Sequence, residues 1–313
     1  MRWVTCAHEG RDRVGLVLDD TVHLLDDDRT LIEILSAGRE ETERAAEVAR
    51  QRPVAVLPLD TTTLRSPIPR PPSVRDTVGF LDHVRGCRRA YGRETRLGEV
   101  WNQVPAFYFA NPATLFGARD DVAIAPGSEW FDFELEVAAV IGTPGSDLDA
   151  AEGQRAIAGY MLFCDWTARD LQRLDTALGI GQGKGKDSGM TFGPWLVTAD
   201  EVADHLVDGR LDLQVRAEVN GVEIAHGTTG AMDWTFGEIV SYVSRGTRVL
   251  PGDVIGSGTI PGGCLLEHLV GDPAGYDGWL KPGDVVSLHG AALGSTHQRV
   301  VASARPHPLP SGF

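Results

Sequence analysis

The sequence predicts a mainly β protein of the α+β class, in which a curled, mainly antiparallel β domain follows a small N-terminal α+β domain. Three observations support this prediction: many short apolar runs of strand length, few helical stretches, and one proline-rich segment that divides the chain. With 313 residues, 42% of them hydrophobic, the chain is long enough for one large and one small domain. We expect the small domain at residues 1–70 and the large one at residues 71–313.

The N-terminal domain begins with a predicted meander of three strands, at residues 3–6, 14–18 and 21–25. Thr30 is a favoured N-cap residue, and the stretch after it is predicted to be helical, with a break near Gly38, to about Arg52. Residues 65–72 contain four prolines, which exclude a helix and predict a stiff extended linker. We place the domain boundary there.

The large domain is rich in glycine, and its clearest predicted strands are residues 137–141, 195–197, 211–219, 254–255 and 285–288. Asn220-Gly221 is the signature of a tight type I′ hairpin, with residues 222–224 as the returning strand. Helices are predicted at about residues 151–159, 166–176, 200–206 and 236–245.

The composition excludes several classes of partner. The formal net charge is −15, from 29 basic and 44 acidic residues, which argues against binding to nucleic acid or to an anionic membrane surface. A small anionic substrate stays possible, because a bound divalent cation reverses the local field. No run approaches the roughly 18 apolar residues of a membrane span, and the first residues do not resemble a signal peptide. With four scattered cysteines, we expect a reduced, cytoplasmic protein.

Two acids, Glu134 and Glu136, lie two residues apart in a strand-like stretch, and Asp165 follows in the next apolar segment. Alternate side chains of a strand share a face, so Glu134 and Glu136 would repel each other unless a cation or a proton lies between them. Three carboxylates without a Cys or His ligand indicate an oxygen-only site, which suits Mg²⁺, Mn²⁺ or Ca²⁺ better than zinc. The alternative is that Glu134 and Glu136 form the solvent face of an amphipathic strand, and the spacing alone does not decide between the two.

The order of four motifs resembles the fumarylacetoacetate hydrolase superfamily, over about residues 73–301. These motifs are Glu-Leu-Glu-Val-Ala at 134–138, Asp-Trp-Thr-Ala-Arg-Asp-Leu-Gln at 165–172, Gly-Lys-Asp-Ser-Gly-Met-Thr-Phe-Gly-Pro-Trp at 185–195, and Pro-Gly-Asp-Val-Ile-Gly-Ser-Gly-Thr at 251–259. The resemblance implies a curled, mixed β-sheet (a β-roll) of the fumarylacetoacetase C-terminal type, a homodimer, and a small-molecule substrate that is an oxo acid or a diketone.

The resemblance also implies a metal site. Glu134, Glu136 and Asp165 would be ligands, with Mg²⁺ as the first choice and Mn²⁺ or Ca²⁺ as alternatives. The fumarylacetoacetase branch adds a fourth acid seven residues before a catalytic histidine, and Asp76 and His83 stand at this spacing. Without the neighbouring motifs, a lone His83 would more simply be a structural or surface histidine.

Glu267 resembles the glutamate that orients this histidine, so that His83 and Glu267 would together activate a water molecule. Lys186 would place a positive charge beside the developing oxyanion. Gln172 and Thr259 would bind substrate. The alternatives are an exposed acid for Glu267, a solvated loop lysine for Lys186, a solvated helix glutamine for Gln172 and a plain strand-end threonine for Thr259.

Some positions depart from the family pattern. Val78 stands where the fumarylacetoacetase branch has a substrate-binding tyrosine, and the residues after His83 lack the His-x-x-Glu glutamate of the acylpyruvase and decarboxylase branch. Asn111 replaces the lysine of a Lys-Pro pair common in that branch. Residues 87–106 are predicted to form a mobile lid. Arg169, four residues after Asp165, is expected to contact Asp165 or buried carbonyls in a structural role.

The sequence therefore predicts a metal-dependent hydrolase that cleaves a carbon–carbon bond of a β-diketone or acylpyruvate-type substrate. The first alternative is a decarboxylase or keto–enol tautomerase of a 2-oxo acid, which has no need to deliver a nucleophilic water. The second alternative is a non-catalytic, metal-binding member of the family.

Overall fold

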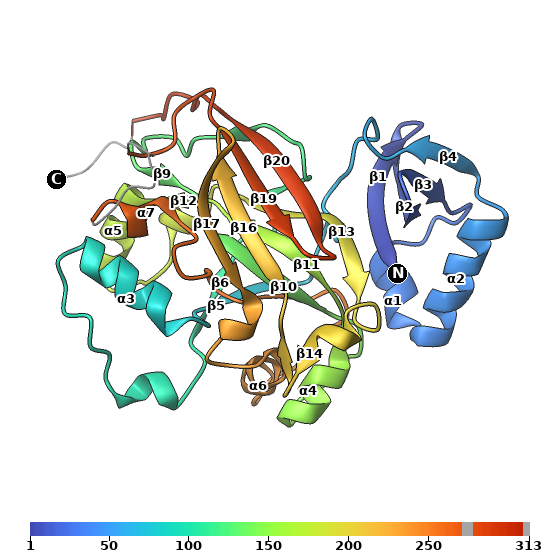
Figure 1. Ribbon diagram of the computed structural model, residues 1–313, viewed down its shortest axis with the longest axis horizontal. Helices are drawn as coiled ribbons and strands as arrows, with labels where there is room; N and C mark the ends of the chain where they lie inside the picture. Colours follow the sequence, from blue (N-terminus) through green and yellow to red (C-terminus); the bar gives the residue numbers. More distant parts are fainter. Residues whose placement is uncertain (271–277, 309–313) are drawn as a thin grey trace.

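Two β-sheets organise the protein, as the computed structural model shows for residues 1–270 and 278–308 (Figure 1). The larger sheet has the order β4 (Ala55–Pro58), β3 (Thr21–Leu24), β2 (Arg11–Leu18), β1 (Arg2–His8), β13 (Met190–Thr198), β11 (Ile157–Asp165), β10 (Leu135–Ile141), β18 (Val254–Gly256), β5 (Val74–Thr77) and β6 (Phe107–Ala110), with β7 (Leu115–Phe116) beside β13. The second sheet has the order β17 (Val222–Thr228), β16 (Gln214–Val219), β19 (Val285–Gly290), β20 (Gly294–Val301) and β8 (Val122–Ala123).

Most neighbouring strands are antiparallel, and β18–β5, β13–β7 and β20–β8 are parallel. Two short pairs complete the β structure of the described residues, β9 (Phe131–Asp132) with β12 (Thr167–Ala168) and β14 (Leu206–Val207) with β15 (Arg210–Leu211). The predicted mainly β, mixed architecture is confirmed. The type I′ hairpin at Asn220-Gly221 is present, because both residues have positive φ (53° and 77°) between β16 and β17.

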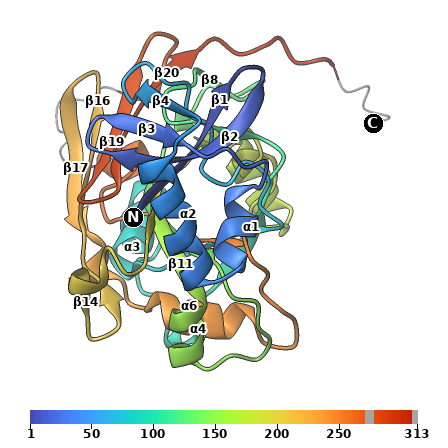
Figure 2. The same cartoon turned by 90° about the vertical axis from the view of Figure 1, so that its right-hand side faces the viewer.

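The helices are short and lie outside the sheets (Figures 1 and 2). They are α1 (Leu31–Ser36), α2 (Arg39–Gln51), α3 (Leu81–Ala90), α4 (Ala150–Ala156), α5 (Arg169–Ala177), α6 (Phe236–Val243) and α7 (Leu265–His268). Single 3₁₀ turns are η1 (Glu99–Asn102), η2 (Lys184–Lys186), η3 (Ala203–His205) and η4 (Thr229–Ala231). Thr30 caps α1 as predicted, through a reciprocal capping box with Glu33.

Three predictions of local structure are corrected. The helix expected at 200–206 is wrong: only η3 forms, and β14 and β15 pair across Asp208-Gly209, whose positive φ values make a tight turn. The helix expected at 151–159 ends at Ala156, where β11 begins. The strand expected at 211–219 is interrupted between β15 and β16. Helix α3, which holds His83, was not predicted.

The N-terminal unit joins the large sheet through β1, which pairs with β13 in the register Trp3↔Leu196. Figure 2 shows α1 and α2 below this unit's strands. One buried cluster contains Trp3 and Ile34 of this unit together with Val140 and Phe163 of β10 and β11. The boundary predicted at residues 70/71 stays a prediction, and residues 309–313 of the predicted large domain lie outside the described residues. The linker at 65–72 is packed rather than free, because Ile68 is fully buried.

The centre of the large sheet brings the predicted acids together. Glu136 lies on β10, Asp165 ends the neighbouring β11, and Asp76 lies on β5, beside Gly256 of β18. The backbone N–H of Asp165 donates to the carbonyl of Glu134 at 3.2 Å. Four acids from three separate segments of the sequence thus face one region. No helix among the described residues is long and apolar enough to cross a membrane.

Because the N-terminal unit shares a buried cluster with β10 and β11, we expect Trp3→Ala to lower the free energy of unfolding of the whole protein by about 3–5 kcal/mol. Denaturant unfolding followed by fluorescence and by circular dichroism measures it. The matched control is Val54→Ala in the same unit, where the side chain is 46% exposed and a change within about 0.5 kcal/mol is expected. Two separate transitions, with only the first shifted, would contradict the shared core.

Candidate active site

A pocket of ≈ 270 Å³ contains most of the predicted site residues. Seven of them line it: Asp76, His83, Glu134, Glu136, Gln172, Lys186 and Thr259. The other two contact these directly, since Asp165 bonds to Lys186 and Glu267 bonds to His83. The structure therefore brings all nine predicted residues together. A larger surface pocket of ≈ 580 Å³, beside Trp195 and His289, lacks these acids.

Four buried carboxylates form the base of the pocket. Carboxylate oxygens of Asp76, Glu136 and Asp165 lie within 4.8 Å of one another, and Glu134 is beside them. Glu134 is 4% exposed and Glu136 is fully buried, so the alternative of a solvent-exposed strand face is wrong. Among the described residues, Glu136 Oε2 and Asp165 Oδ1 are buried without any hydrogen-bond partner.

Burial and crowding raise the pKa values of three of these acids, whereas the pKa of the fourth is lowered. Burial, reinforced by the charge of Asp165, raises the pKa of Asp76 to about 7. Burial and the charge of Asp76 raise the pKa of Glu136 well above its usual range, and burial also raises the pKa of Asp165. For Glu134, burial is outweighed by Lys186 and Arg169, which lower its pKa. Three of the four acids thus resist ionisation together unless a cation joins them.

Two buried cations and a phenol contact the carboxylates. Lys186, from η2, donates from Nζ to Asp165 Oδ2 at 2.6 Å and also to Glu134. It is 4% exposed, so the alternative of a solvated loop lysine is wrong. The hydroxyl of Tyr108 donates to Asp165. Arg169 pairs with Glu134 (Nη2 to Oε1, 2.8 Å) and Asp132 (Nε to Oδ2, 2.8 Å) rather than with Asp165 as expected.

His83 and Glu267 form a hydrogen-bonded pair that joins α3 to α7. His83 Nδ1 lies 2.9 Å from Glu267 Oε2, and its Nε2 lies 4.0 Å from Glu134 Oε1. The Glu267 side chain is only 7% exposed, so the alternative of an exposed acid is wrong. Burial disfavours the charged imidazole, but Glu267 outweighs it and raises the pKa of His83 to about 10. Since the carboxylate accepts from Nδ1–H, the neutral ring presents an unprotonated Nε2 to the pocket.

The two predicted substrate-binding residues lie at different depths. Thr259 is 3% exposed, and its hydroxyl donates to Glu136 Oε1 at 3.2 Å. Gln172 is half-buried; it accepts from Arg169 at 3.3 Å and donates to Gln182 at 2.9 Å. Both line the pocket, and their role in binding substrate stays a prediction.

A match to a family model agrees with this geometry. The model described as fumarylacetoacetate (FAA) hydrolase C-terminal matches residues 73–301. The chain belongs to this family. Human mitochondrial oxaloacetate tautomerase FAHD2A is 30% identical to it over 279 residues, covering 88% of this chain and 82% of the relative.

Solved structures of the family share the fold. Fumarylacetoacetate hydrolase from Exiguobacterium antarcticum is 27% identical, with a TM-score of 0.73 over 96% of this chain and 99% of that one. A probable 2-hydroxyhepta-2,4-diene-1,7-dioate isomerase from Mycobacterium abscessus is 29% identical, with a TM-score of 0.68 over 97% and 100%. The family is thus one of enzymes, with hydrolases, isomerases and tautomerases among its members.

Sequence reasoning missed three residues that build this family site here. Tyr108 and Asp132 contact site residues, and Asp132 also accepts from the backbone N–H groups of Leu265 and Leu266 (2.8 and 3.1 Å), which fixes α7. A Cβ at Gly86 would lie 2.4 Å from Glu267 Oε1, so this glycine lets α3 approach α7. The only sequence feature that could have indicated Tyr108 as a site residue is its place between two phenylalanines. Asp132 and Gly86 depend on contacts with residues distant in the sequence.

The carboxylate cluster fits a divalent cation. It offers oxygen donors only, two of them buried without hydrogen-bond partners, and it has more acids than Lys186 and Arg169 can balance. Asp76, Glu134, Glu136 and Asp165 would hold the ion, as the sequence predicted.

We expect Glu136→Gln to raise the melting temperature of the metal-free protein, because it removes one of the crowded negative charges. The same variant should lose most of the stabilisation that Mg²⁺ or Mn²⁺ gives the wild type, about 2.7 kcal/mol at 100 times Kd. Thermal melts with chelator and with metal measure both effects. Glu129→Gln changes an exposed acid and serves as the control. Equal metal stabilisation of Glu136→Gln and wild type would contradict the site.

Proposed function

We propose that this chain is a metal-dependent hydrolase that cleaves a carbon–carbon bond of a β-diketone or acylpyruvate-type substrate. The observation that carries the proposal is the His83–Glu267 pair, 2.9 Å apart, whose free Nε2 faces the carboxylate cluster. A histidine held by a carboxylate in this way is suited to take a proton from water beside a polarised carbonyl.

The chain's residues divide the chemistry among them. A divalent cation at the carboxylates would polarise the substrate's carbonyl oxygens. His83 Nε2 removes a proton from water as the water oxygen bonds to the carbonyl carbon, and Glu267 stabilises the imidazolium that results. When the carbon–carbon bond breaks, its electron pair goes to the leaving carbon, and His83 returns the proton there. One water is consumed and two carbonyl products form, one of them a new carboxylic acid.

The charges around His83 decide whether it acts as a base. In the metal-free protein Glu267 raises its pKa to about 10, which would leave the ring protonated at neutral pH. A cation among the adjacent carboxylates would oppose this shift, because like charges repel. Burial lowers the pKa of Lys186, but the charges of Asp165 and Glu134 outweigh burial and raise that pKa, so Lys186 stays a cation next to the acids and favours a developing oxyanion.

The pocket wall supports an anionic substrate. Arg88 and Arg93 line the pocket together with Tyr91, all from the segment predicted to be a lid. The mobility of that segment stays a prediction, as do a homodimer and a cytoplasmic location. Val78 also lines the pocket, as an apolar side chain. The substrate that these residues favour has one carboxylate near the arginines and a small or apolar group near Val78.

A keto–enol tautomerase is the second candidate, because the human relative with that activity matches 88% of this chain. The same His83 could move a proton between carbon and oxygen without water. The two candidates differ in products: hydrolysis gives two molecules from one, whereas tautomerisation gives one. A decarboxylase would release carbon dioxide.

We expect His83→Ala to reduce kcat for acylpyruvate cleavage by roughly 10²–10⁴-fold, with metal binding retained, because it removes the base alone. Turnover of an acylpyruvate panel and of oxaloacetate, with Mg²⁺ or Mn²⁺ and product analysis, measures it. Cleavage into two products that is lost in the variant supports the hydrolase. Tautomerisation or carbon dioxide release that survives in the variant would contradict the proposed role of the pair.

We expect Gly86→Ala to reduce kcat by at least about tenfold without weakening α3, because the new Cβ displaces Glu267 while alanine is the better helix former. Steady-state kinetics and a thermal melt measure the two effects. Arg89→Ala, an exposed change on the same helix, is the control and should keep both values. Unchanged kcat in Gly86→Ala would show that the position of Glu267 does not matter.

A further inference from the structure

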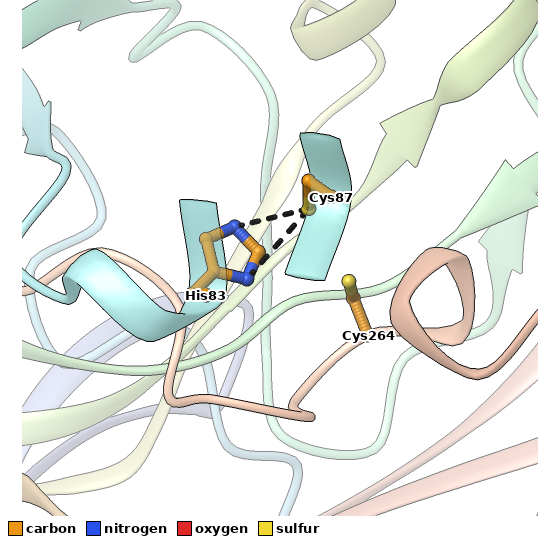
Figure 3. A group of neighbouring side chains, drawn as sticks. All are labelled: His83, Cys87 and Cys264. Atoms are coloured by element: carbon orange, nitrogen blue, oxygen red, sulfur yellow. Dashed lines mark hydrogen bonds between the residues drawn. The ribbon is translucent and has the colours of Figure 1, made fainter. Parts of the chain in front are cut away.

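Two cysteine thiols lie close to the His83 imidazole and form a second group of donor atoms with it. Cys87 follows His83 by one turn of α3, and Cys264 directly precedes α7. One donor atom of each of the three residues lies within 4.8 Å of the other two. Figure 3 shows the imidazole and the two sulfur atoms turned toward one another. The proposed hydrolase uses neither thiol.

The spacing of these donors suits a tetrahedral ion. Cys87 Sγ lies 3.6 Å from His83 Nε2 and 3.9 Å from Nδ1, so it lies beside the ring and must turn toward the Nε2 lone pair when an ion binds. A tetrahedral zinc ion with bonds of about 2.3 Å to sulfur and about 2.05 Å to nitrogen separates those ligands by about 3.6 Å. Two sulfurs and one imidazole are also the donor types that select zinc-class ions over magnesium.

The second nitrogen of His83 is arranged as in a zinc site. Glu267 Oε2 lies 2.9 Å from Nδ1, which holds the proton on that nitrogen and leaves Nε2 as the donor. A carboxylate behind a metal-binding histidine fixes its tautomer and raises its basicity. Glu267 Oε2 is also 3.5 Å from Cys264 Sγ and accepts from the backbone N–H of Gly262 at 3.0 Å.

An ion has a path to this group and a means of charge balance. His83 and Cys87 both line the pocket, and Cys87 is half-buried, whereas Cys264 is fully buried. Two thiols that lose their protons to solvent as a divalent cation binds leave a neutral group, which burial tolerates.

We propose that His83, Cys87 and Cys264 form a second cation site, which takes a soft, zinc-class divalent ion with an open fourth position. Binding uses the lone pair of His83 Nε2, the same pair that accepts the proton of water in the proposed hydrolase. The ion at this site and the catalytic use of His83 are therefore mutually exclusive. Zinc-class ions inhibit the enzyme at a site separate from the oxygen-only cluster.

Cd²⁺ is the probe, added to the full chain under a reducing agent that does not bind metal, with saturating Mg²⁺ to occupy the carboxylates. We expect one equivalent of Cd²⁺ per chain to produce the ultraviolet thiolate-to-cadmium charge-transfer band, which carboxylates do not give. Cys87→Ser and Cys264→Ser should each weaken the band, because one thiolate remains, and should weaken binding by more than the roughly 10–100-fold cost of losing an outer-shell partner. Glu267→Gln should keep the band with binding weakened by about that factor.

Cys6→Ala is the matched control, because Cys6 is a free, buried cysteine of β1 in a separate hydrophobic cluster. It should keep the full band. No band at one equivalent, or a band unchanged in Cys87→Ser, would overturn the proposal. Cys87 is half-buried, so Cys87→Ser decides the result even where Cys264→Ser fails to fold. The band requires no substrate, and its outcome is therefore independent of the proposed hydrolase.

Discussion

The burial of like charges is the constraint on which the site depends. Four carboxylates are placed in a region from which water is largely excluded, where their mutual repulsion is strong. Lys186 and Arg169 balance part of this charge, and they do so unequally, since both contact Glu134 and only Lys186 contacts Asp165. Neither Asp76 nor Glu136 forms an ion pair with a lysine or arginine of the described residues. A cation added there would relieve the repulsion, so metal affinity and fold stability would be linked in this cluster.

The fold supplies this crowding through its central strands. Adjacent strands place Glu136, Asp165 and Asp76 side by side, and the parallel pair β18–β5 carries Asp76 into the same region as the antiparallel strands. Because β10 is buried along its whole length and Glu134, which directly precedes it, is buried too, Glu134 and Glu136 cannot turn to solvent. The surrounding apolar residues stabilise the sheet against the electrostatic cost. The N-terminal unit adds to that apolar support through the cluster around Trp3.

Much of this arrangement follows from local patterns in the sequence. The Glu-x-Glu spacing, the cap at Thr30 and the Asn220-Gly221 turn each depend on neighbouring residues only, and the structure shows all three features. The Asp208-Gly209 dipeptide also indicates a turn, but the apolar residues before it led to the wrong prediction of a helix. The sequence did not predict the burial of Glu134 and Glu136, because the alternating pattern of a strand does not show whether its polar face lies in water or in the protein interior.

Contacts between distant segments account for what the sequence did not predict. Nothing near Gly86 in the sequence shows that α7 packs against it and leaves no room for a side chain. Asp132 likewise fixes α7 and pairs with Arg169 only because the fold brings these distant segments together. The His83–Glu267 pair spans 184 residues, so only the resemblance to a family suggested it. Long-range pairs of this kind form only when distant segments pack together, and no local pattern in the sequence predicts that packing.

His83 is the residue at which the possible chemistries separate. Its Nδ1 is held by Glu267, so the other ring nitrogen, Nε2, would serve every function proposed for the pocket. If a water molecule lies between that nitrogen and the substrate carbonyl, proton removal produces a nucleophile and leads to bond cleavage. If the substrate's acidic C–H lies there instead, the same proton removal leads to an enol. The thiols of Cys87 and Cys264 offer the nitrogen a third partner. Relatives named as a hydrolase, an isomerase and a tautomerase are consistent with one shared base whose result depends on what the pocket wall admits beside it.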